Sequence, residues 1–273
     1  MNNKPIVSII IPCYNYGHFI GETIESVEQC DSQSYELIIV DDGSTDENTR
    51  AVLKNLREKG YNVIEQENKG VAAARNTGVA AAAGKYILPL DSDDKINPSY
   101  LSLAVEVLEK NQEVGVVYGR AEFFGSKRGE WKLPDFELEK LLIYNYIYVS
   151  AVYRKKVWTQ CGGYDTDPKI DGWEDWDFWL SASAKGWKFT QLEETVFRYR
   201  IHEASKMEPH RAKQQVPPAI QQYIMCKHSE LYRKHFVALY GDAVLSNHWK
   251  SHPLRGIARL SLMQLKAFLN YTR

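Results

Sequence analysis

Short apolar segments alternate with longer amphipathic segments over the first 118 residues of this 273-residue chain. Residues 7–12 form an apolar run that ends at a proline, and residues 36–40 form a second such run. Runs of this kind are typical of strands buried on both faces, and helices with one apolar face usually connect them. The alternation favours parallel βαβ units. We therefore expect an α/β fold with a Rossmann-like, mostly parallel central sheet flanked by helices.

The same patterns predict the individual elements. Ser44 and Glu47 match a capping box, which predicts that a helix begins there and runs to about residue 59. Residues 120–170 mix aromatic, glycine and charged residues, so we expect irregular structure with edge strands there. Elsewhere we expect helices over residues 19–29, 71–83, 98–111 and 174–185, and strands over residues 61–64, 84–90, 115–118, 188–192 and 196–200.

Charge is distributed unevenly along the chain. The formal net charge of −1 provides no general attraction to nucleic acid or to a membrane. Residues 206–273, however, contain eleven Lys and Arg against three Asp and Glu, a net charge of +8, which leaves −9 for the remainder. This asymmetry predicts an acidic body followed by a basic extension, which we expect to be mainly helical from about residue 213 and interrupted around residues 246–253.

Cysteine spacing and hydropathy indicate where in the cell the protein is expected to be located. The four cysteines have no CxxC or zinc-like spacing, and no signal peptide precedes Val7, so we expect reduced thiols in a cytoplasmic protein. No apolar run approaches the roughly 20 residues that span a bilayer. The basic extension either meets anionic lipid at the membrane surface or packs on the body or on a second subunit of a homodimer. The residues available for lipid contact are Lys227, Arg233, Lys234, Lys250, Arg255, Arg259 and Lys266.

Two carboxylates follow the buried strand expected over residues 84–90. In an extended backbone, Asp91 and Asp93 point the same way while Ser92 faces away. Carboxylates aimed at one point repel each other unless a cation lies between them, and Mg²⁺ favours such oxygen ligands together with substrate phosphates. The pair therefore suggests a metal–phosphate site at the carboxyl end of a strand, although a solvated acidic turn explains the residues equally well.

Polar and aromatic residues also follow the first two strands. The residues are Pro12-Cys13-Tyr14-Asn15 after the first strand and Asp41-Asp42-Gly43-Ser44 after the second. Both groups lie at the same edge of a parallel sheet, where the Tyr14 ring can stack on a nucleobase and an aspartate can accept the N3–H of uracil or thymine. An ordinary packed tyrosine and a capped turn are the alternatives.

The alanine-rich segment that begins at Asn68-Lys69-Gly70 carries a single arginine. Its small residues allow the helix to pack closely on the sheet, and Arg75 projects a fixed cation from it. The guanidinium can hold either the aspartate cluster or a donor phosphate in a bidentate geometry. A surface arginine is the simpler alternative.

Acidic and aromatic residues are concentrated in residues 171–180. Trp176, Trp179 and Leu180 have the spacing of one buried helical face. Glu174 and Asp175 in the first helical turn are favoured by the helix dipole, but one carboxylate would suffice there. An acid packed among large apolar rings is poorly solvated and suits a proton acceptor, so we expect a general base here.

Taken in order, five segments resemble the family 2 glycosyltransferases, which have the GT-A fold. The segments are residues 8–15 (SIIIPCYN), 39–46 (IVDDGSTD), 70–76 (GVAAARN), 91–94 (DSDD) and 173–175 (WED). The resemblance covers about residues 5–202. It implies inversion at the anomeric carbon, Mg²⁺ or Mn²⁺, a UDP- or dTDP-linked sugar donor and a hydroxyl of a glycan or lipid-linked acceptor. Synthesis of a bacterial surface polysaccharide is the role that the family suggests.

The resemblance also implies roles for individual residues. Asp175 corresponds to the catalytic base, with Glu174 beside it, and the metal ligands would be Asp93, Asp91 and His202. For His202 an isolated polar histidine is an equal alternative. The donor would be bound by Pro12, Tyr14, Asn15, Asp42, Arg75, Asp91, Ser92 and Trp173. We expect a GT-A domain over residues 1–205, with a nucleotide-binding half (1–118) and an acceptor and catalytic half (119–205), followed by the basic extension (206–273).

Two other functions are weighed against this one. A sugar-phosphate nucleotidyltransferase would carry a glycine-rich basic loop after the first strand, whereas residues 13–18 contain one glycine and no Lys or Arg. A non-catalytic carbohydrate-binding protein could use Trp173, Trp176 and Trp179 for sugar contacts. The presence of both the aspartate pair and Glu174-Asp175 argues against that alternative.

Overall fold

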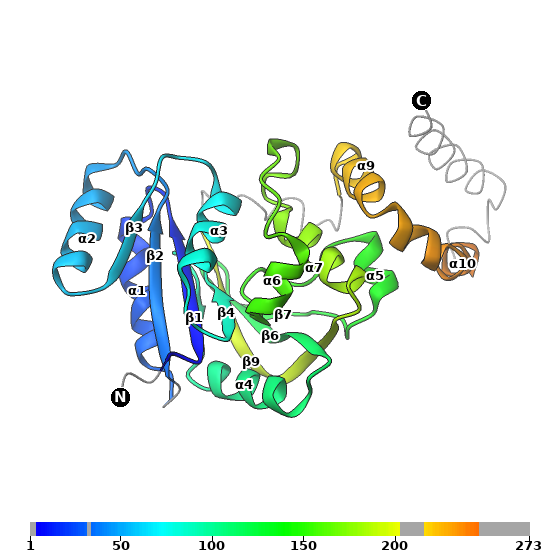
Figure 1. Cartoon of the computed structure of the whole chain (residues 1–273), viewed down its shortest axis with the longest axis horizontal. Helices are drawn as coiled ribbons and strands as arrows, with labels where there is room; N and C mark the ends of the chain where they lie inside the picture. Colours follow the sequence, from blue (N-terminus) through cyan, green and yellow to red (C-terminus); the bar gives the residue numbers. More distant parts are fainter. Residues whose placement is uncertain (1–3, 32–33, 203–215, 246–273) are drawn as a thin grey trace.

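The computed structural model describes residues 4–31, 34–202 and 216–245. Within these residues, one sheet has the strand order β3-β2-β1-β4-β8-β6-β9-β5, and β7 pairs with β6 beyond this path. Figure 1 shows β1 to β3 towards one end of the molecule and the helices α9 and α10 at the other.

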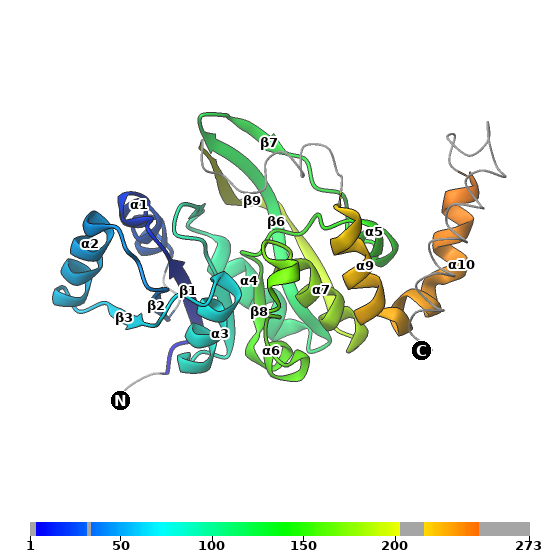
Figure 2. The same ribbon diagram turned by 90° about the horizontal axis from the view of Figure 1, so that it is seen from above.

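The first half of the sheet is parallel, as the alternating pattern predicts. Its strands are β1 (Val7–Cys13), β2 (Tyr35–Asp41), β3 (Asn62–Glu65) and β4 (Tyr86–Pro89). The connecting helices are α1 (Gly17–Glu28), α2 (Glu47–Glu58) and α3 (Val71–Ala81). Figure 2 shows α1 and α2 on one face of this half and α3 on the other. All seven residues of β1 are buried, as expected for a strand covered on both sides.

The second half mixes strand directions. β8 (Val152–Arg154) pairs antiparallel with both β4 and β6 (Val114–Gly125), and the short β5 (Lys95–Ile96) and β7 (Gly129–Trp131) are also antiparallel to their neighbours. The expectation of two strands over residues 188–192 and 196–200 is wrong. A single strand, β9 (Lys188–Ile201), runs parallel to β6 along its whole length, and register shifts around Gly119–Arg120 accommodate the irregular stretch.

Helices complete the second half of the fold. They are α4 (Tyr100–Lys110), α5 (Leu138–Ile143), α6 (Lys155–Cys161), the 3₁₀ turn η1 (Pro168–Ile170), α7 (Glu174–Ala184), α9 (Pro218–Lys227) and α10 (Ser229–Leu245). Residues 120–170 therefore contain more regular structure than the sequence suggests. The helices predicted over residues 98–111 and 174–185 are confirmed to within a few residues.

Two local expectations are corrected. The helix α2 is capped by Asp46, whose carboxylate accepts a 2.7 Å hydrogen bond from the backbone N–H of Thr49, and not by Ser44. The helix α7 has no single buried face, because Glu174, Asp175 and Asp177 are buried together with Trp176 and Trp179. The spacing of the apolar residues predicts one buried face, whereas this helix is buried on more than one face because it runs through the interior.

The structure describes only part of the basic extension. Among all the residues that the structure describes, no helix is long and apolar enough to cross a membrane. Lys250, Arg255, Arg259 and Lys266, and the interruption expected around residues 246–253, lie outside the described residues.

The close packing expected of the alanine-rich helix depends on Gly78. A Cβ atom added at Gly78 would lie 2.3 Å from Cγ2 of Ile10 on β1 and 3.2 Å from Cγ2 of Val40 on β2. Both neighbours are buried in the core, so the sheet would have to shift to admit a methyl group.

We predict that Gly78→Ala lowers the free energy of unfolding by about 1–3 kcal/mol, because overpacking displaces the two strands. Urea denaturation measures this value. Gly21 in α1, where an added Cβ meets nothing within 4 Å, provides the matched control. Gly21→Ala should raise stability by up to about 1 kcal/mol through helix propensity. Equal stability of Gly78→Ala and the wild type would contradict the close packing.

Candidate active site

A cleft of about 600 Å³ opens at the carboxyl ends of β1, β2 and β4. Most of the residues expected at the site line it: Pro12, Tyr14, Asp42, Arg75, Asp91, Ser92, Asp93, Glu174 and Asp175. The structure thus brings together side chains that lie up to 163 residues apart in sequence. Asn15, Trp173 and His202 are the expected residues that do not line the cleft.

The aspartate segment after β4 is a turn. The N–H of Asp94 donates a 3.1 Å hydrogen bond to the carbonyl of Asp91, so the segment is not the extended backbone that the sequence argument assumed. Ser92 consequently lines the cleft instead of facing away, and its carbonyl accepts a 2.9 Å hydrogen bond from the Thr23 hydroxyl. The turn still places both Asp91 and Asp93 in the cleft wall.

Asp42 organises one rim of the cleft. Its carboxylate accepts hydrogen bonds from the backbone N–H groups of Lys69 and Gly70, each at 2.9 Å, and from Nε2 of Gln66 at 2.7 Å. Gly70 has a φ of +86°, a conformation that side-chain-bearing residues rarely adopt. The end of β2 and the start of α3 are thereby held together beside the exposed Tyr14 ring, which has 42% of its surface accessible.

Asn15 holds two loops together behind the cleft. It has a φ of +60°, and its side-chain oxygen accepts hydrogen bonds from the N–H groups of Thr45 (2.8 Å) and Asp46 (2.9 Å). Its own N–H donates to the Ser44 hydroxyl at 3.1 Å. Asn15 thus joins the loops that follow β1 and β2, and its side-chain oxygen is engaged by this backbone.

Arg75 lies at the centre of the acidic residues. Its guanidinium is 3% exposed and forms ion pairs with Asp91, at 2.6 Å, and with Glu174. Burial lowers the pKa of Arg75, but the two carboxylates raise it by more, so the group stays charged. Of the two roles weighed for this cation, the structure shows the first, in which it holds the acidic cluster.

Asp93 and His202 form the second pair in this region. Nε2 of His202 lies 2.9 Å from Oδ2 of Asp93, and its ring packs edge-on against Tyr16. Burial and the neighbouring Asp91 carboxylate raise the pKa of Asp93, whereas His202 opposes this rise. A nearby positive charge therefore favours the ionised carboxylate, as a bound divalent cation would.

The described residues contain no group of three or more His, Cys, Asp or Glu side chains arranged to hold a metal ion alone. Mg²⁺ and Mn²⁺ are commonly held by one or two carboxylates together with substrate phosphates, because such ions retain non-protein ligands. Asp91 and Asp93 supply hard oxygen donors that face a cleft large enough for a phosphate ligand.

Asp175 reaches the same cleft from α7. It is 4% exposed, and its Oδ1 accepts a 2.8 Å hydrogen bond from the N–H of Trp176. Trp173 is buried and packs against Trp176, with ring centroids 5.9 Å apart. The tryptophan therefore supports the start of α7 from behind and does not form part of the cleft surface.

Several lining residues were not foreseen as site residues. Phe197 and Tyr199 lie on β9, and the long-range pairing of β6 and β9 sets their position. Tyr148 precedes β8, and its hydroxyl forms hydrogen bonds with the backbone of Gly119 on β6. The sequence contains no local signal for any of the three. The loop before α7 adds Asp165, Thr166, Asp167, Pro168 and Asp171. Its density of acidic residues was the only available hint.

We predict that Arg75→Met lowers the free energy of unfolding by about 3–5 kcal/mol, because two carboxylates in the cleft wall lose their shared cation. Urea denaturation tests this value. Arg57→Met, which removes the exposed pair with Glu65, is the control and should change stability by less than about 1 kcal/mol. Similar small effects of both substitutions would show that Arg75 is not the central cation.

Comparisons with known proteins identify the class. The sequence model described as "Glycosyl transferase family 2" matches residues 8–164, which is more than half of the chain. An uncharacterized glycosyltransferase of Methanocaldococcus jannaschii, MJ1057, is 27% identical over 211 residues, which cover 73% of this chain and 72% of that protein. The hyaluronan synthase of Pasteurella multocida is 29% identical over 208 residues, which cover 74% of this chain but only 21% of the synthase.

Solved structures agree on the fold. The Staphylococcus aureus protein TarS (residues 1–349), in complex with UDP-GlcNAc, has a TM-score of 0.64 and 19% identity, covering 94% of this chain and 81% of that one. The mannosyltransferase PcManGT from Pyrobaculum calidifontis, in complex with GDP-Man and Mn²⁺, has a TM-score of 0.58 and 17% identity, covering 98% and 88%.

The structure has the GT-A fold. The chain belongs to glycosyl transferase family 2, and both the predicted resemblance and the predicted enzyme class are confirmed. The family match does not support the nucleotidyltransferase and carbohydrate-binding alternatives.

Proposed function

We propose that this enzyme is an inverting, metal-dependent glycosyltransferase that uses a UDP- or dTDP-linked sugar. The observation that carries the proposal is that Asp93 and Asp175, 82 residues apart, line one cleft together with Tyr14. One carboxylate can then serve the donor phosphates while the other serves the acceptor hydroxyl.

The donor would occupy the side of the cleft formed by the ends of β1, β2 and β4. The exposed ring of Tyr14 offers a stacking surface for the base, and Pro12 and Ser92 line the same cleft. Asp42 would accept the N3–H of the base in addition to its bonds to the loop that precedes α3, since each carboxylate oxygen has two lone pairs. Asn15 would contribute by fixing the loop that carries Tyr14, and Trp173 by supporting the other wall.

Asp91 and Asp93 would hold Mg²⁺ or Mn²⁺, and His202, which contacts Asp93, belongs to the same proposed set. When bound, the cation would neutralise the charge that develops on the leaving diphosphate. Binding of Mn²⁺ together with GDP-Man in PcManGT supports a divalent cation for this fold. Arg75 fixes Asp91 so that its carboxylate faces the cleft.

Asp175 would remove the proton from the acceptor hydroxyl as that oxygen attacks the anomeric carbon. Attack from the face opposite the diphosphate inverts the configuration in a single displacement, through an oxocarbenium-like transition state. Glu174 would not act as the base itself, because its Oε1 pairs with Arg75. It would instead hold the first turn of α7 against α3.

The acceptor is proposed to be a glycan or a lipid-linked glycan in the synthesis of a bacterial surface polysaccharide. Similarity to part of the hyaluronan synthase of Pasteurella multocida supports this class of product. The four cysteines are free thiols, which is typical of proteins in a reducing compartment and supports a cytoplasmic reaction. Membrane contact and a homodimer remain proposals for the basic extension.

We predict that Asp175→Asn lowers the rate of sugar transfer about 10²–10⁴-fold, because the general base is lost. Donor binding should be unchanged, since the substitution preserves the size of the side chain. Transfer kinetics and calorimetric titration with UDP measure the two effects. Asp135→Asn, an exposed residue outside the cleft, is the matched control. Near-normal turnover of Asp175→Asn would refute the assignment of the base.

We predict that Asp93→Ala weakens the binding of UDP in the presence of Mn²⁺ by about tenfold or more, which corresponds to about 1.4 kcal/mol or more. The binding that remains should no longer depend on Mn²⁺, because a metal ligand is missing. Calorimetric titration with and without the ion measures both effects. Unchanged, metal-dependent affinity would remove Asp93 from the metal site.

A further inference from the structure

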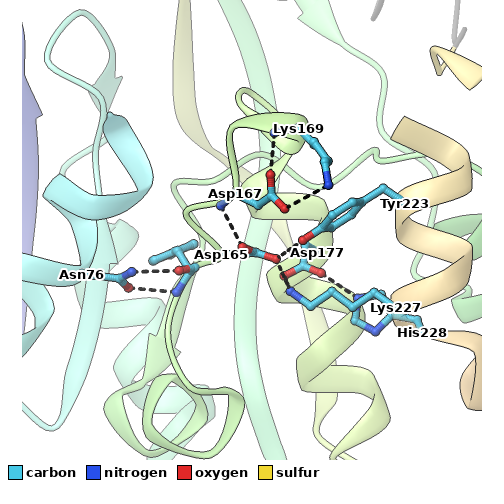
Figure 3. Close-up of polar contacts among 9 residues, drawn as sticks. Asn76, Asp165, Asp167, Lys169, Asp177, Tyr223, Lys227 and His228 are labelled. Atoms are coloured by element: carbon cyan, nitrogen blue, oxygen red, sulfur yellow. Dashed lines mark hydrogen bonds and ion pairs between the residues drawn. The ribbon is translucent and has the colours of Figure 1, made fainter. Parts of the chain in front are cut away.

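The helix α9 packs against the loop that forms one wall of the cleft, although it lies beyond the residues matched by the family model. This loop, residues 165–172, joins the end of the matched segment to α7 and includes η1. Figure 3 shows Tyr223, Lys227 and His228 reaching from the α9 region to Asp165 at the start of the loop and to Asp177 in α7. We call Tyr223, Lys227 and His228 the α9 clamp.

The first contact is at the start of the loop. Asp165 Oδ2 accepts a 2.7 Å hydrogen bond from the Tyr223 hydroxyl and a bond from Nζ of Lys227. Its Oδ1 accepts a 2.9 Å hydrogen bond from the N–H of Asp167, which shapes the turn into η1. The α9 clamp thus holds a carboxylate that itself orders the cleft loop.

The second contact is in the first turn of α7. Asp177 is 2% exposed, and its two oxygens lie 2.9 Å from Nζ of Lys227 and 2.8 Å from Nε2 of His228. A single ammonium group therefore joins the start of the loop to the first turn of α7. It reaches the same helical turn that carries Asp175.

The opposite side of the loop is anchored by α3. The amide of Asn76 exchanges two 2.8 Å hydrogen bonds with the backbone of Tyr164, the residue just before Asp165. Figure 3 shows these bonds on the side facing away from α9. The chain at residues 164–165 is therefore held between the donor half and α9, which leaves the loop little freedom to move.

Charge keeps this arrangement in place. Burial lowers the pKa of Lys227, but its bonds to Asp165 and Asp177 raise it by more, so the ammonium group stays charged. Removing it would take the ammonium partner from the buried Asp177 carboxylate and leave it the contact with His228, which costs stability. The sequence groups Lys227 with the residues available for lipid contact, whereas in the structure its ammonium group forms these two ion pairs while 37% of the side chain stays exposed.

We propose that Lys227, assisted by Tyr223 and His228, is a positioning residue for glycosyl transfer that fixes the cleft loop and the first turn of α7. This inference rests on the proposed function, because the group so positioned is the Asp175 base together with the wall on the acceptor side. The clamp comes from the α9 region, whereas Tyr14 and Asp42 follow β1 and β2, which lie towards the other end of the molecule (Figure 1), so we expect it to act on transfer and not on nucleotide binding.

The test compares Lys227→Met with Lys227→Arg and with Lys234→Met, which changes an exposed lysine on α10. The probes are UDP with Mn²⁺ in calorimetry and UDP-GlcNAc with Mn²⁺ in a hydrolysis assay, in which water is the acceptor. Lys227→Met should lower kcat for hydrolysis about tenfold to a hundredfold, because misplacing a catalytic group costs this much. UDP affinity should be unchanged. Lys227→Arg should recover most of the rate, since a guanidinium can also bridge two carboxylates.

Hydrogen exchange provides a readout that does not depend on activity. Amides of residues 165–177 should exchange faster in Lys227→Met and at the wild-type rate in Lys234→Met. Tyr223→Phe removes one hydrogen bond to Asp165 without changing the charge, and it takes the place of Lys227→Met if that variant does not fold. The exchange of the same amides should then also be faster, but by a smaller factor.

Two results would overturn the inference. The first is that Lys227→Met keeps the wild-type kcat and the wild-type rates of amide exchange. The second is that this variant loses UDP affinity by the same factor as it loses kcat. If the wild-type enzyme neither binds UDP nor hydrolyses UDP-GlcNAc, the proposed donor fails, while the exchange measurement still decides whether Lys227 holds the loop.

Discussion

The buried guanidinium of Arg75 is the interaction on which the cleft depends. Asp91 belongs to the segment after β4 and Glu174 to the first turn of α7, so one cation from α3 joins three separate parts of the chain. Without it, carboxylates gathered in one cleft would repel each other and could not remain buried. The same cation therefore supports the acidic cleft and adds a link between α7 of the second half and α3 of the first, beside the β4–β8 pairing of the sheet.

A second cation completes this scheme on the other side of α7. Lys227 bridges Asp165 and Asp177 as Arg75 bridges Asp91 and Glu174. The helix that carries Asp175 is thus held by ion pairs from α3 on one side and from α9 on the other. Placement of this kind suits the general base proposed for Asp175, because proton transfer depends on geometry before it depends on pKa.

The first half of the fold could be predicted because its information is local. Buried strands such as residues 7–12 and the turns that follow them are encoded in short segments, and parallel βαβ units have few possible arrangements. The second half could not be predicted in the same way. β9 is one strand and not two because β6 pairs with it along its full length, and no short segment contains that information. The sequence groups Lys227 with the residues available for lipid contact for the same reason, since its partners lie 50 and 62 residues away.

The sequence predicted which residues gather at the candidate site better than it predicted the backbone conformation that brings them there. Asp91 and Asp93 were expected to share a face of an extended strand, but they reach the cleft through a turn. Asn15 and Trp173 lie behind the cleft surface, where they hold the loops and the helix that carry lining residues. Motif order thus named residues that mostly line one cleft, whereas the division between lining and supporting residues required the structure.

A crystal structure of the protein with UDP-GlcNAc and Mg²⁺ would test this account most directly. The account predicts a cation at the roughly 2.0–2.1 Å typical of Mg²⁺ from a carboxylate oxygen of Asp93, with the diphosphate on the same ion. It also predicts that Asp175 faces the anomeric carbon from the side opposite the diphosphate, with Arg75 still paired to Asp91 and Glu174. A nucleotide bound outside this cleft, or a cation that Asp93 does not contact, would contradict it.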